Sequence, residues 1–195
     1  MKFGRKPKDL ELNAEFSSER FRMVPCSFVD AFQISYLWNA NPEILRNITF
    51  DSRPRSKVQW YRQFTRPDGH KNFVHGIVPK SGKGAIGLHI VALNDSGVAT
   101  PSIALHAKSW WGKGVFAEVR RAAMDHFFTS DRVNKFTSMV SGRNMASIFN
   151  YRALGLNPTG TLRQHRRDPA DDTYHDIIIF EVLKEDWPLP AEGAA

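Results

Sequence analysis

The sequence contains a single cysteine and no long uninterrupted run of hydrophobic residues. Cys26 alone cannot build an internal disulfide framework, and this cysteine usage is compatible with a reducing cytoplasm. No apolar stretch approaches the roughly 18 residues that a membrane-spanning helix requires. The basic N-terminus also lacks the apolar segment of a secretory signal peptide. These absences predict a cytoplasmic protein that has no membrane as a partner.

The sequence also lacks the spacings that identify common metal sites and nucleic-acid-binding modules. It contains no zinc-finger spacing, basic-zipper pattern or aromatic-interleaved RNA-binding motif. We therefore expect no metal cofactor. Lysine and arginine nevertheless number 27 against 20 acidic residues, which gives a net charge of +7. That balance suits a polyanionic partner such as nucleic acid, but a generic solvated basic surface explains it equally well.

Length and composition predict one domain. With 195 residues, of which 42% are hydrophobic, the chain can bury a sizeable core. Residues 1–19 are polar and predict a flexible arm or an added short element. Residues 20–187 form the expected domain, and residues 188–195 are expected to be a frayed tail.

Apolar periodicity and turn signals predict the order of the elements. Expected strands cover residues 20–26, 71–78, 85–93, 102–107, 134–140, 159–167 and 174–183. Expected helices cover residues 27–39, 41–46, 54–66, 115–128 and 144–154. In helix 115–128, Arg120, Arg121 and Asp125 are expected to face solvent. The order predicts an α+β protein with three layers, in which helices flank a mixed, mostly antiparallel central sheet of about seven strands.

A glycine-rich turn joins the fourth expected strand to the following helix. The turn reads Trp110-Trp111-Gly112-Lys113-Gly114-Val115-Phe116-Ala117. At such a turn the first backbone N–H groups of the helix have no partner, and with the positive end of the helix dipole they attract anions. Glycine lets a phosphate approach the backbone, and Lys113 adds positive charge. The sequence predicts an anion site here, with a purely structural turn as the alternative.

Two later motifs make this pattern more specific. The runs Asn144-x-Ala146-Ser147-Ile148 and Leu154-Gly155-Leu156 follow the glycine-rich turn along the chain. Together the three blocks resemble the GNAT superfamily of acyl-CoA-dependent N-acyltransferases, and most closely the branch that contains the ribosomal-protein-alanine and diamine N-acetyltransferases. The resemblance covers residues 20–187. It implies a GNAT-like fold in which the fourth and fifth strands splay apart.

The resemblance also implies a function. It indicates an enzyme that transfers an acetyl or related acyl group from acetyl-CoA, or another acyl-CoA, to a primary amine by direct attack. The acceptor could be a protein N-terminus, a small amine, an amino sugar or an antibiotic, and a homodimer fits the branch. Two other classes stay open: a non-catalytic acyl-CoA-binding or regulatory module, and a protein that docks to nucleic acid or ribosomes.

The same resemblance assigns roles to individual residues. Backbone N–H groups of residues 112–117 would hold the CoA pyrophosphate, and the pantetheine arm would pair with the chain near residues 106–110. Asn144 and Ser147 would contact that arm, although asparagine is also a good helix N-cap. Tyr151 would protonate the departing thiolate, with a core aromatic as the alternative.

The sequence departs from the family pattern at two positions. The branch often carries a glutamate, the usual general base, at the start of the strand before the glycine-rich turn, where this chain reads Thr100-Pro101-Ser102-Ile103. His106 is the nearest titratable candidate for the base, with a structural histidine as the alternative. Phe116 occupies a position where glycine or alanine is usual, and its bulk could crowd the phosphates. Both departures allow an unusual substrate or a protein that binds acyl-CoA without catalysis.

Overall fold

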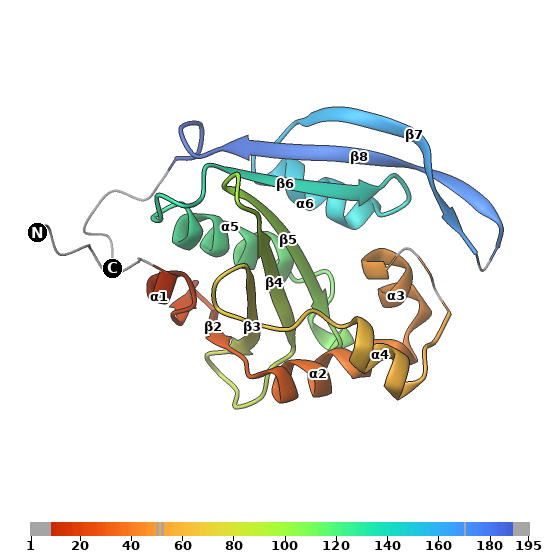
Figure 1. Ribbon diagram of the computed structural model, residues 1–195, viewed down its shortest axis with the longest axis horizontal. Coiled ribbons are helices and arrows are strands. Elements are labelled where there is room, and N and C mark those ends of the chain that lie inside the picture. The colour runs from red at the N-terminus through yellow and green to blue at the C-terminus, as the bar shows by residue number, and fades with distance from the viewer. Residues whose placement is uncertain (1–8, 50, 52, 170, 189–195) are drawn as a thin grey trace, which may run out of the picture.

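The chain folds into an eight-stranded sheet with helices on both faces (Figure 1). The structure is a computed structural model, and it describes residues 9–49, 51, 53–169 and 171–188. The strands are β1 (Phe16–Ser17), β2 (Phe21–Pro25), β3 (Asn72–Pro79), β4 (Gly87–Leu93), β5 (Val98–Leu105), β6 (Lys135–Ser141), β7 (Pro158–Asp168) and β8 (Thr173–Leu183). The helices are α1 (Asp9–Leu12), α2 (Phe28–Tyr36), η1 (Leu37–Ala40), α3 (Pro42–Thr49), α4 (Lys57–Gln63), η2 (Lys108–Trp110), α5 (Val115–Phe127) and α6 (Met145–Ala153).

One junction in the sheet differs from all the others. The strand order is β1-β2-β3-β4-β5-β6-β8-β7, and neighbours are antiparallel except β5 and β6, which run parallel. These two strands pair only at Val98 with Lys135 and at Ala99 with Phe136, and then separate. Pro101 in β5 has no backbone N–H to offer a neighbour, which suits a strand that is not paired on both sides. The predicted splay and the mostly antiparallel sheet are confirmed, with β1 as an additional strand.

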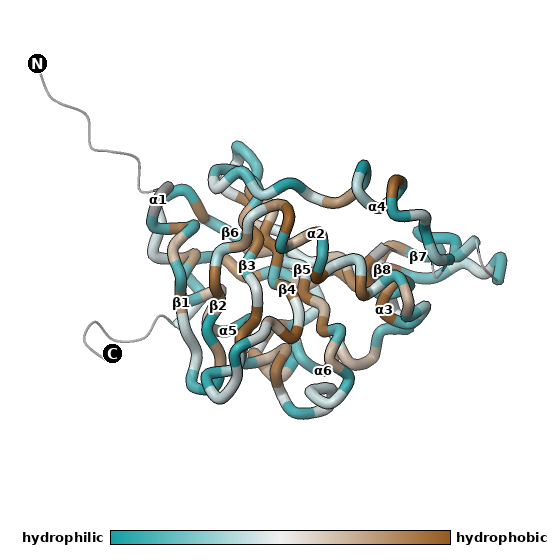
Figure 2. The backbone as a smooth tube through the Cα atoms, turned by 90° about the horizontal axis from the view of Figure 1, so that it is seen from below, coloured by the Kyte–Doolittle hydropathy of each residue, from teal (hydrophilic) through white to brown (hydrophobic). Residues whose placement is uncertain are grey.

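Two groups of helices form the outer layers of the predicted three-layer arrangement. On one face, α2, η1, α3 and α4 bury side chains such as Trp38 and Trp60 against β3, β4 and β5. On the other face, α5 and α6 contribute Val119, Phe127 and Tyr151 to the core. Hydrophobic positions concentrate in the central strands, whereas the far end of the β7–β8 hairpin is hydrophilic (Figure 2). Within the described ranges, none of the helices has the length and apolar character of a membrane span.

Side-chain caps determine where several helices begin. Ser56 and Gln59 form a capping box, so α4 starts after Ser56 and not at residue 54 as predicted. Ser27 caps α2, as the sequence indicates, but the α-helix ends at Tyr36 and continues as the short helix η1. The Oδ1 atom of Asn144 accepts a hydrogen bond from the Ser147 N–H group at 3.0 Å, which confirms the predicted N-cap of α6.

Residues 9–19, the described part of the predicted arm, form an added short element. The strand β1 pairs with β2, and Leu12 is only 1% exposed, which corrects the flexible-arm alternative for these residues. The carbonyl oxygen of Ala14 lies 3.3 Å from Nε2 of His75, and that of Leu12 lies 3.2 Å from Nε2 of His126. Residues 1–8 and 189–195 lie outside the described residues, so the frayed tail stays a prediction.

Gly87 in β4 marks a close approach between two backbones beside the splay. A Cβ atom at this position would lie 2.2 Å from the Ala104 carbonyl oxygen and 2.9 Å from the Leu105 Cα, both in the main chain of β5. We expect Gly87→Ala to lower the free energy of unfolding by about 2 kcal/mol or more, because β5 has to move to relieve the overlap. Urea unfolding measures this change. Gly84→Ala is the matched control, since a Cβ there meets nothing within 4 Å, and equal losses would contradict the prediction.

Candidate functional site

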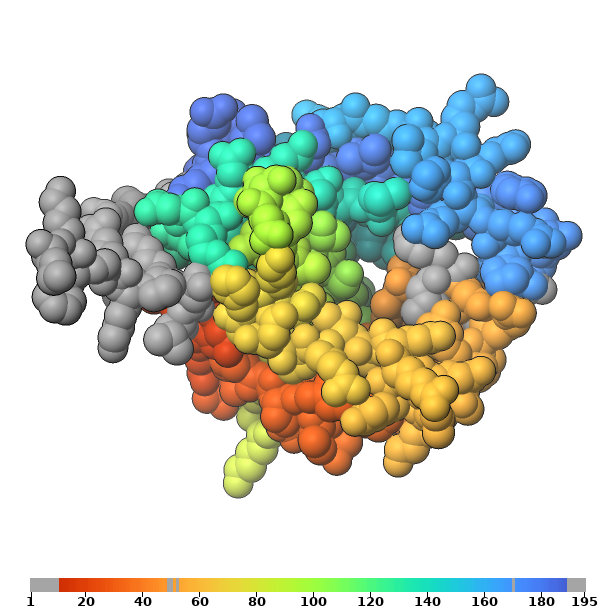
Figure 3. All heavy atoms as spheres, in the orientation of Figure 1, coloured from red at the N-terminus to blue at the C-terminus, as the bar shows by residue number. Residues whose placement is uncertain are grey.

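A cavity of about 620 Å³ opens where β5 and β6 separate. Its walls come from α3, β5, β6, α6 and the N-terminal part of α5, and the surface is hollowed between the orange α3 region and the green strands (Figure 3). The β7–β8 hairpin reaches toward α3 at the far side, where Arg46 Nε and Asp168 Oδ2 pair at 2.9 Å. The size suits a small-molecule ligand or one part of a larger ligand.

The glycine-rich turn leads into α5 through two left-handed residues. Gly112 has a φ of +72°, and Gly114, the N-cap of α5, has a φ of +73°, a region that favours glycine. The Glu118 N–H group donates to the Gly114 carbonyl oxygen at 3.2 Å and begins the helical bonding. The N–H groups of residues 115–117 lie before this first helical bond and have no acceptor within the helix. They can therefore donate hydrogen bonds to an anion.

An ion pair between Arg20, the residue before β2, and Glu118 stabilises this turn. Arg20 bonds Glu118 Oε2 through Nε at 2.7 Å and donates from Nη2 to the Lys113 carbonyl oxygen at 2.9 Å. Glu118 also accepts a hydrogen bond from Ser18 Oγ at 2.7 Å. Burial opposes the ionisation of Glu118, but the hydrogen bonds and the Arg20 charge outweigh it and lower the Glu118 pKa. The Glu118 charge is balanced in this way and does not oppose an anion at the turn.

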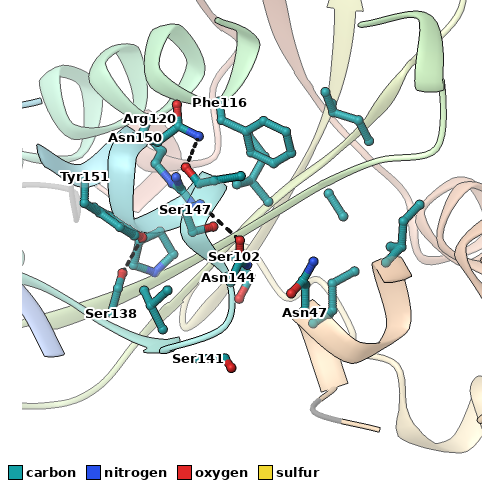
Figure 4. Close-up of a pocket in the computed structure, with 18 of the residues that line it drawn as sticks. Asn47, Ser102, Phe116, Arg120, Ser138, Ser141, Asn144, Ser147, Asn150 and Tyr151 are labelled. Atoms are coloured by element: carbon teal, nitrogen blue, oxygen red, sulfur yellow. Dashed lines mark hydrogen bonds between the residues drawn. The ribbon is translucent and has the colours of Figure 1, made fainter. Parts of the chain in front are cut away.

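Tyr151 lies on α6, where the cavity meets β6. Its side chain is 2% exposed, and its ring stacks on Phe180 with centroids 5.0 Å apart. The Tyr151 Oη atom lies 2.6 Å from Ser138 Oγ, and Figure 4 shows this bond in the cavity wall. Tyr151 is therefore a core aromatic that also places a hydroxyl at the cavity, so its two predicted roles are compatible.

The structure brings most of the predicted cofactor residues to the cavity. Those that line it are Trp111, Gly112, Gly114, Phe116, Asn144 and Ser147. Trp110, Lys113, Val115 and Ala117 belong to the same turn but are not part of the lining. Val115 is 1% exposed and belongs to the core, whereas Lys113 is exposed, with Nζ 5.7 Å from the centroid of the Trp110 ring.

His106 is not brought together with Tyr151. It follows the last residue of β5, is half-buried, and does not belong to the cavity lining. Burial lowers the pKa of His106, and its Nδ1 atom has no hydrogen-bond partner among the described residues. The structure favours the structural alternative for His106 over the role of general base.

Several cavity residues were not predicted from the sequence, and three of them, on α5 and α3, are charged or amide residues. Arg120, which was expected to face solvent, is only 5% exposed and lines the cavity, so that prediction is wrong. Glu43 and Asn47 lie one turn apart on α3 and both line the cavity, and Figure 4 shows Asn47 across the cavity from Ser147 and Arg120. The wall therefore carries a cation on the α5 side and a carboxylate on the α3 side.

Comparisons with known proteins agree with the family resemblance found in the sequence. A family model described as "Acetyltransferase (GNAT) domain" matches residues 20–157. No curated protein matches the chain by sequence. A spermidine N-acetyltransferase from Vibrio cholerae, in complex with CoA and spermine, has a TM-score of 0.72 at 19% identity, covering 86% of this chain and 97% of that chain.

Two further solved structures resemble the chain to a similar degree. A ribosomal-protein-S5-alanine acetyltransferase from Vibrio fischeri has a TM-score of 0.68 at 17% identity, covering 89% of this chain and 98% of that chain. A GNAT-family acetyltransferase from Bacillus anthracis has a TM-score of 0.71 at 13% identity, covering 88% and 99%. At these identities the likeness shows a shared fold.

Proposed function

Because the chain belongs to the GNAT acetyltransferase family, we propose that it transfers an acetyl group from acetyl-CoA to a primary amine. One observation carries this proposal: the N-terminus of α5, the unpaired side of β5 and the Tyr151 hydroxyl meet at one cavity. These features suit the three parts of an acyl-CoA, which are its phosphates, its extended arm and its thioester. CoA supplies the activated acyl group, so the protein has to bind, orient and move protons.

The donor lies along the gap between β5 and β6 in this proposal. The N–H groups of residues 112–117 bind the pyrophosphate, and Lys113 supplies positive charge beside them. The pantetheine arm follows β5 beyond Ala99, where β6 does not pair with it, and Asn144 and Ser147 contact the arm. Phe116 adds bulk only through its side chain, so its backbone N–H group is still able to donate to a phosphate.

The chemistry requires positioning and two proton transfers. The neutral amine nitrogen attacks the thioester carbonyl carbon, the C–S bond breaks, and Tyr151 protonates the sulfur of the departing thiolate. The proton lost by the amine passes to solvent water, from which the Tyr151 phenol regains its own. Glu43 attracts the ammonium form of the acceptor to the α3 side of the cavity, and this ammonium gives one proton to water before the attack. No covalent enzyme intermediate forms.

The acceptor is a primary amine, which we expect to be a protein N-terminus, a small amine, an amino sugar or an antibiotic. Two of the similar structures are named for spermidine and for a ribosomal-protein alanine, so polyamines and N-terminal peptides lead the acceptor panel. Thiol release from acetyl-CoA with each amine measures transfer. If acetyl-CoA binds but no amine causes thiol release, the proposed enzymatic activity is wrong and the protein is a CoA-binding module.

Two nearly isosteric variants of Gly112 test the phosphate site. A Cβ atom at Gly112 would meet no atom within 4 Å, and both asparagine and aspartate tolerate its positive φ. We expect Gly112→Asp to bind acetyl-CoA at least about tenfold more weakly than Gly112→Asn, because only the aspartate places a negative charge beside the phosphates. The ligand-induced rise in melting temperature reports the binding. No rise for the wild-type protein with any CoA at saturation would overturn the proposed function.

A further inference from the structure

We propose that the preferred acyl donor carries a carboxylate at the end of its acyl chain, and that Arg120 binds this carboxylate. The donor would be the CoA monothioester of a dicarboxylic acid. This inference rests on the proposed function and makes it more specific. It starts from a charged side chain buried in the cavity wall, for which the chemistry of plain acetyl transfer has no use.

Arg120 is a buried cation that has no ion-pair partner among the described residues. It lies on α5, is 5% exposed, and lines the cavity. Its Nε and Nη1 atoms are buried, and neither has a hydrogen-bond partner among the residues that the structure describes. A charge removed from water is strongly unfavourable unless an opposite charge or good hydrogen bonds compensate it. A ligand that brings an anion would supply the missing partner.

The ring contacts that Arg120 makes are not hydrogen bonds, so Nε and Nη1 stay without an acceptor. Its guanidinium carbon lies 4.2 Å from the centroid of the Tyr151 ring and 5.8 Å from that of Phe116. A ring contact of this kind uses the charge of the guanidinium and supplies no acceptor, so its N–H groups still need hydrogen-bond acceptors. A planar fork of donors held in place by aromatic rings is suited to binding a carboxylate through two parallel hydrogen bonds.

The acidic residues nearest to Arg120 in sequence are already engaged elsewhere. Glu118 pairs with Arg20, and Asp125 accepts a hydrogen bond from Trp187 Nε1 at 2.8 Å. Glu43 lines the same cavity from α3, and no ion pair between it and Arg120 occurs among the described residues. The counter-ion of Arg120 is therefore expected to come with the ligand.

The position of Arg120 points to the acyl end of the donor and not to its phosphates. Arg120 follows Gly114 by six residues, which is about 9 Å along a helix axis, so it is remote from the first-turn N–H groups. It lies instead against Tyr151, whose hydroxyl marks the thioester in the proposed mechanism. Figure 4 places Arg120, Ser147 and Tyr151 on the same side of the cavity.

Succinyl-CoA and butyryl-CoA form a matched pair of probes, because their acyl chains have the same length and differ in the terminal carboxylate. We expect the wild-type protein to bind succinyl-CoA at least about tenfold more tightly than butyryl-CoA in calorimetric titrations. In Arg120→Met the two affinities should agree within about twofold, through loss of succinyl-CoA binding alone. Arg121→Met, the same change at the exposed neighbouring position, should keep the wild-type preference.

The possible outcomes separate this inference from the proposed function. Equal binding of the two donors by the wild-type protein, or tighter binding of butyryl-CoA, would overturn the inference and leave acetyl transfer intact. A uniform loss of affinity for every CoA in Arg120→Met would also overturn it, since Arg120 would then contact a part that all donors share. Absence of binding by any CoA would overturn both. The wild-type comparison needs no variant, so it stands even if Arg120→Met does not fold.

Discussion

Replacing Tyr151 by phenylalanine is expected to lower kcat by about 100-fold or more, while the affinity for acetyl-CoA stays nearly unchanged. Phenylalanine keeps the ring that is buried in the core and stacked on Phe180. The substitution removes only the hydroxyl that protonates the thiolate in the proposed mechanism. Initial rates of thiol release with saturating acetyl-CoA and an accepted amine measure kcat, and the rise in melting temperature with acetyl-CoA measures binding.

Tyr174→Phe is the matched control for this experiment. Tyr174 lies on β8 and is 59% exposed, so the same chemical change there should leave kcat unaltered. Removal of the Tyr151 hydroxyl also leaves Ser138 Oγ without its partner, which lowers stability by about 1 kcal/mol, so assays stay well below the melting temperature. A kcat of Tyr151→Phe within about twofold of the wild-type value would contradict this prediction. Water, and not Tyr151, would then protonate the thiolate.

Acidification from about pH 7 to about pH 5 is expected to lower the free energy of unfolding by on the order of 3 kcal/mol. His75 and His89 face each other across β3 and β4, and both are fully buried. Burial, together with repulsion from neighbouring cations, lowers the pKa of His75 to about 4 and that of His89 to about 3. The unfolded chain takes up protons from about pH 6.5 downward, so stability is full above that pH and falls as the pH approaches the folded-state values.

His89→Leu should remove up to about half of this pH dependence, because it deletes one of the two fully buried rings, those of His75 and His89. Both ring nitrogens of His89 lack partners among the described residues, so leucine breaks no hydrogen bond that the structure records. His165→Gln, on the exposed side of β7, is the control and should keep the wild-type slope. Urea unfolding at the two pH values measures the difference. An unfolding free energy that stays constant between them would contradict the prediction.

Protonation of carboxylates does not account for the loss of stability between about pH 7 and about pH 5. Burial opposes the charge of Asp68, but hydrogen bonds from the backbone N–H groups of residues 70–72 outweigh it and lower the Asp68 pKa to about 2. A lowered carboxylate pKa stabilises the fold above the unfolded value of about 4, and this stabilisation is lost only as the pH falls below it. Acid unfolding below about pH 4 therefore has a different origin from the loss assigned to the histidines.

Features of the site that depend on neighbours in sequence could be predicted. The glycine-rich turn at residues 112–114 and the Asn144 cap depend on residues within one turn, so the motifs were sufficient to place them, whereas the left-handed conformation of the two glycines was not predicted. The order of strands followed from period-two patterns and turns in the same way. The separation of β5 from β6 came only through family resemblance, although Pro101 within a strand was a local signal for it.

Features that depend on burial of a charge or on distant segments could not be predicted. Arg120 lies four residues from both Phe116 and Met124, but the apolar periodicity of the helix and the charge of the residue both predicted the solvent side. Glu43 and Asn47 reach the cavity because α3 packs across the sheet and pairs with the distant β7–β8 hairpin through Arg46 and Asp168. No pattern within α3 contains that information.

The short seam between β5 and β6 divides the sheet into two parts. Two residue pairs join β1–β5 to β6–β8, and α5 is the covalent link that crosses from one half-sheet to the other. Native proteins open in cooperative units, and strand pairing is sparse at this seam, although one hydrophobic core cluster runs across it from Phe73 and Val91 to Phe136 and Phe180. An extended ligand in the gap would act as the missing strand between the halves. Ligand binding in the cavity and the rigidity of the whole sheet would then be thermodynamically coupled, so that each strengthens the other.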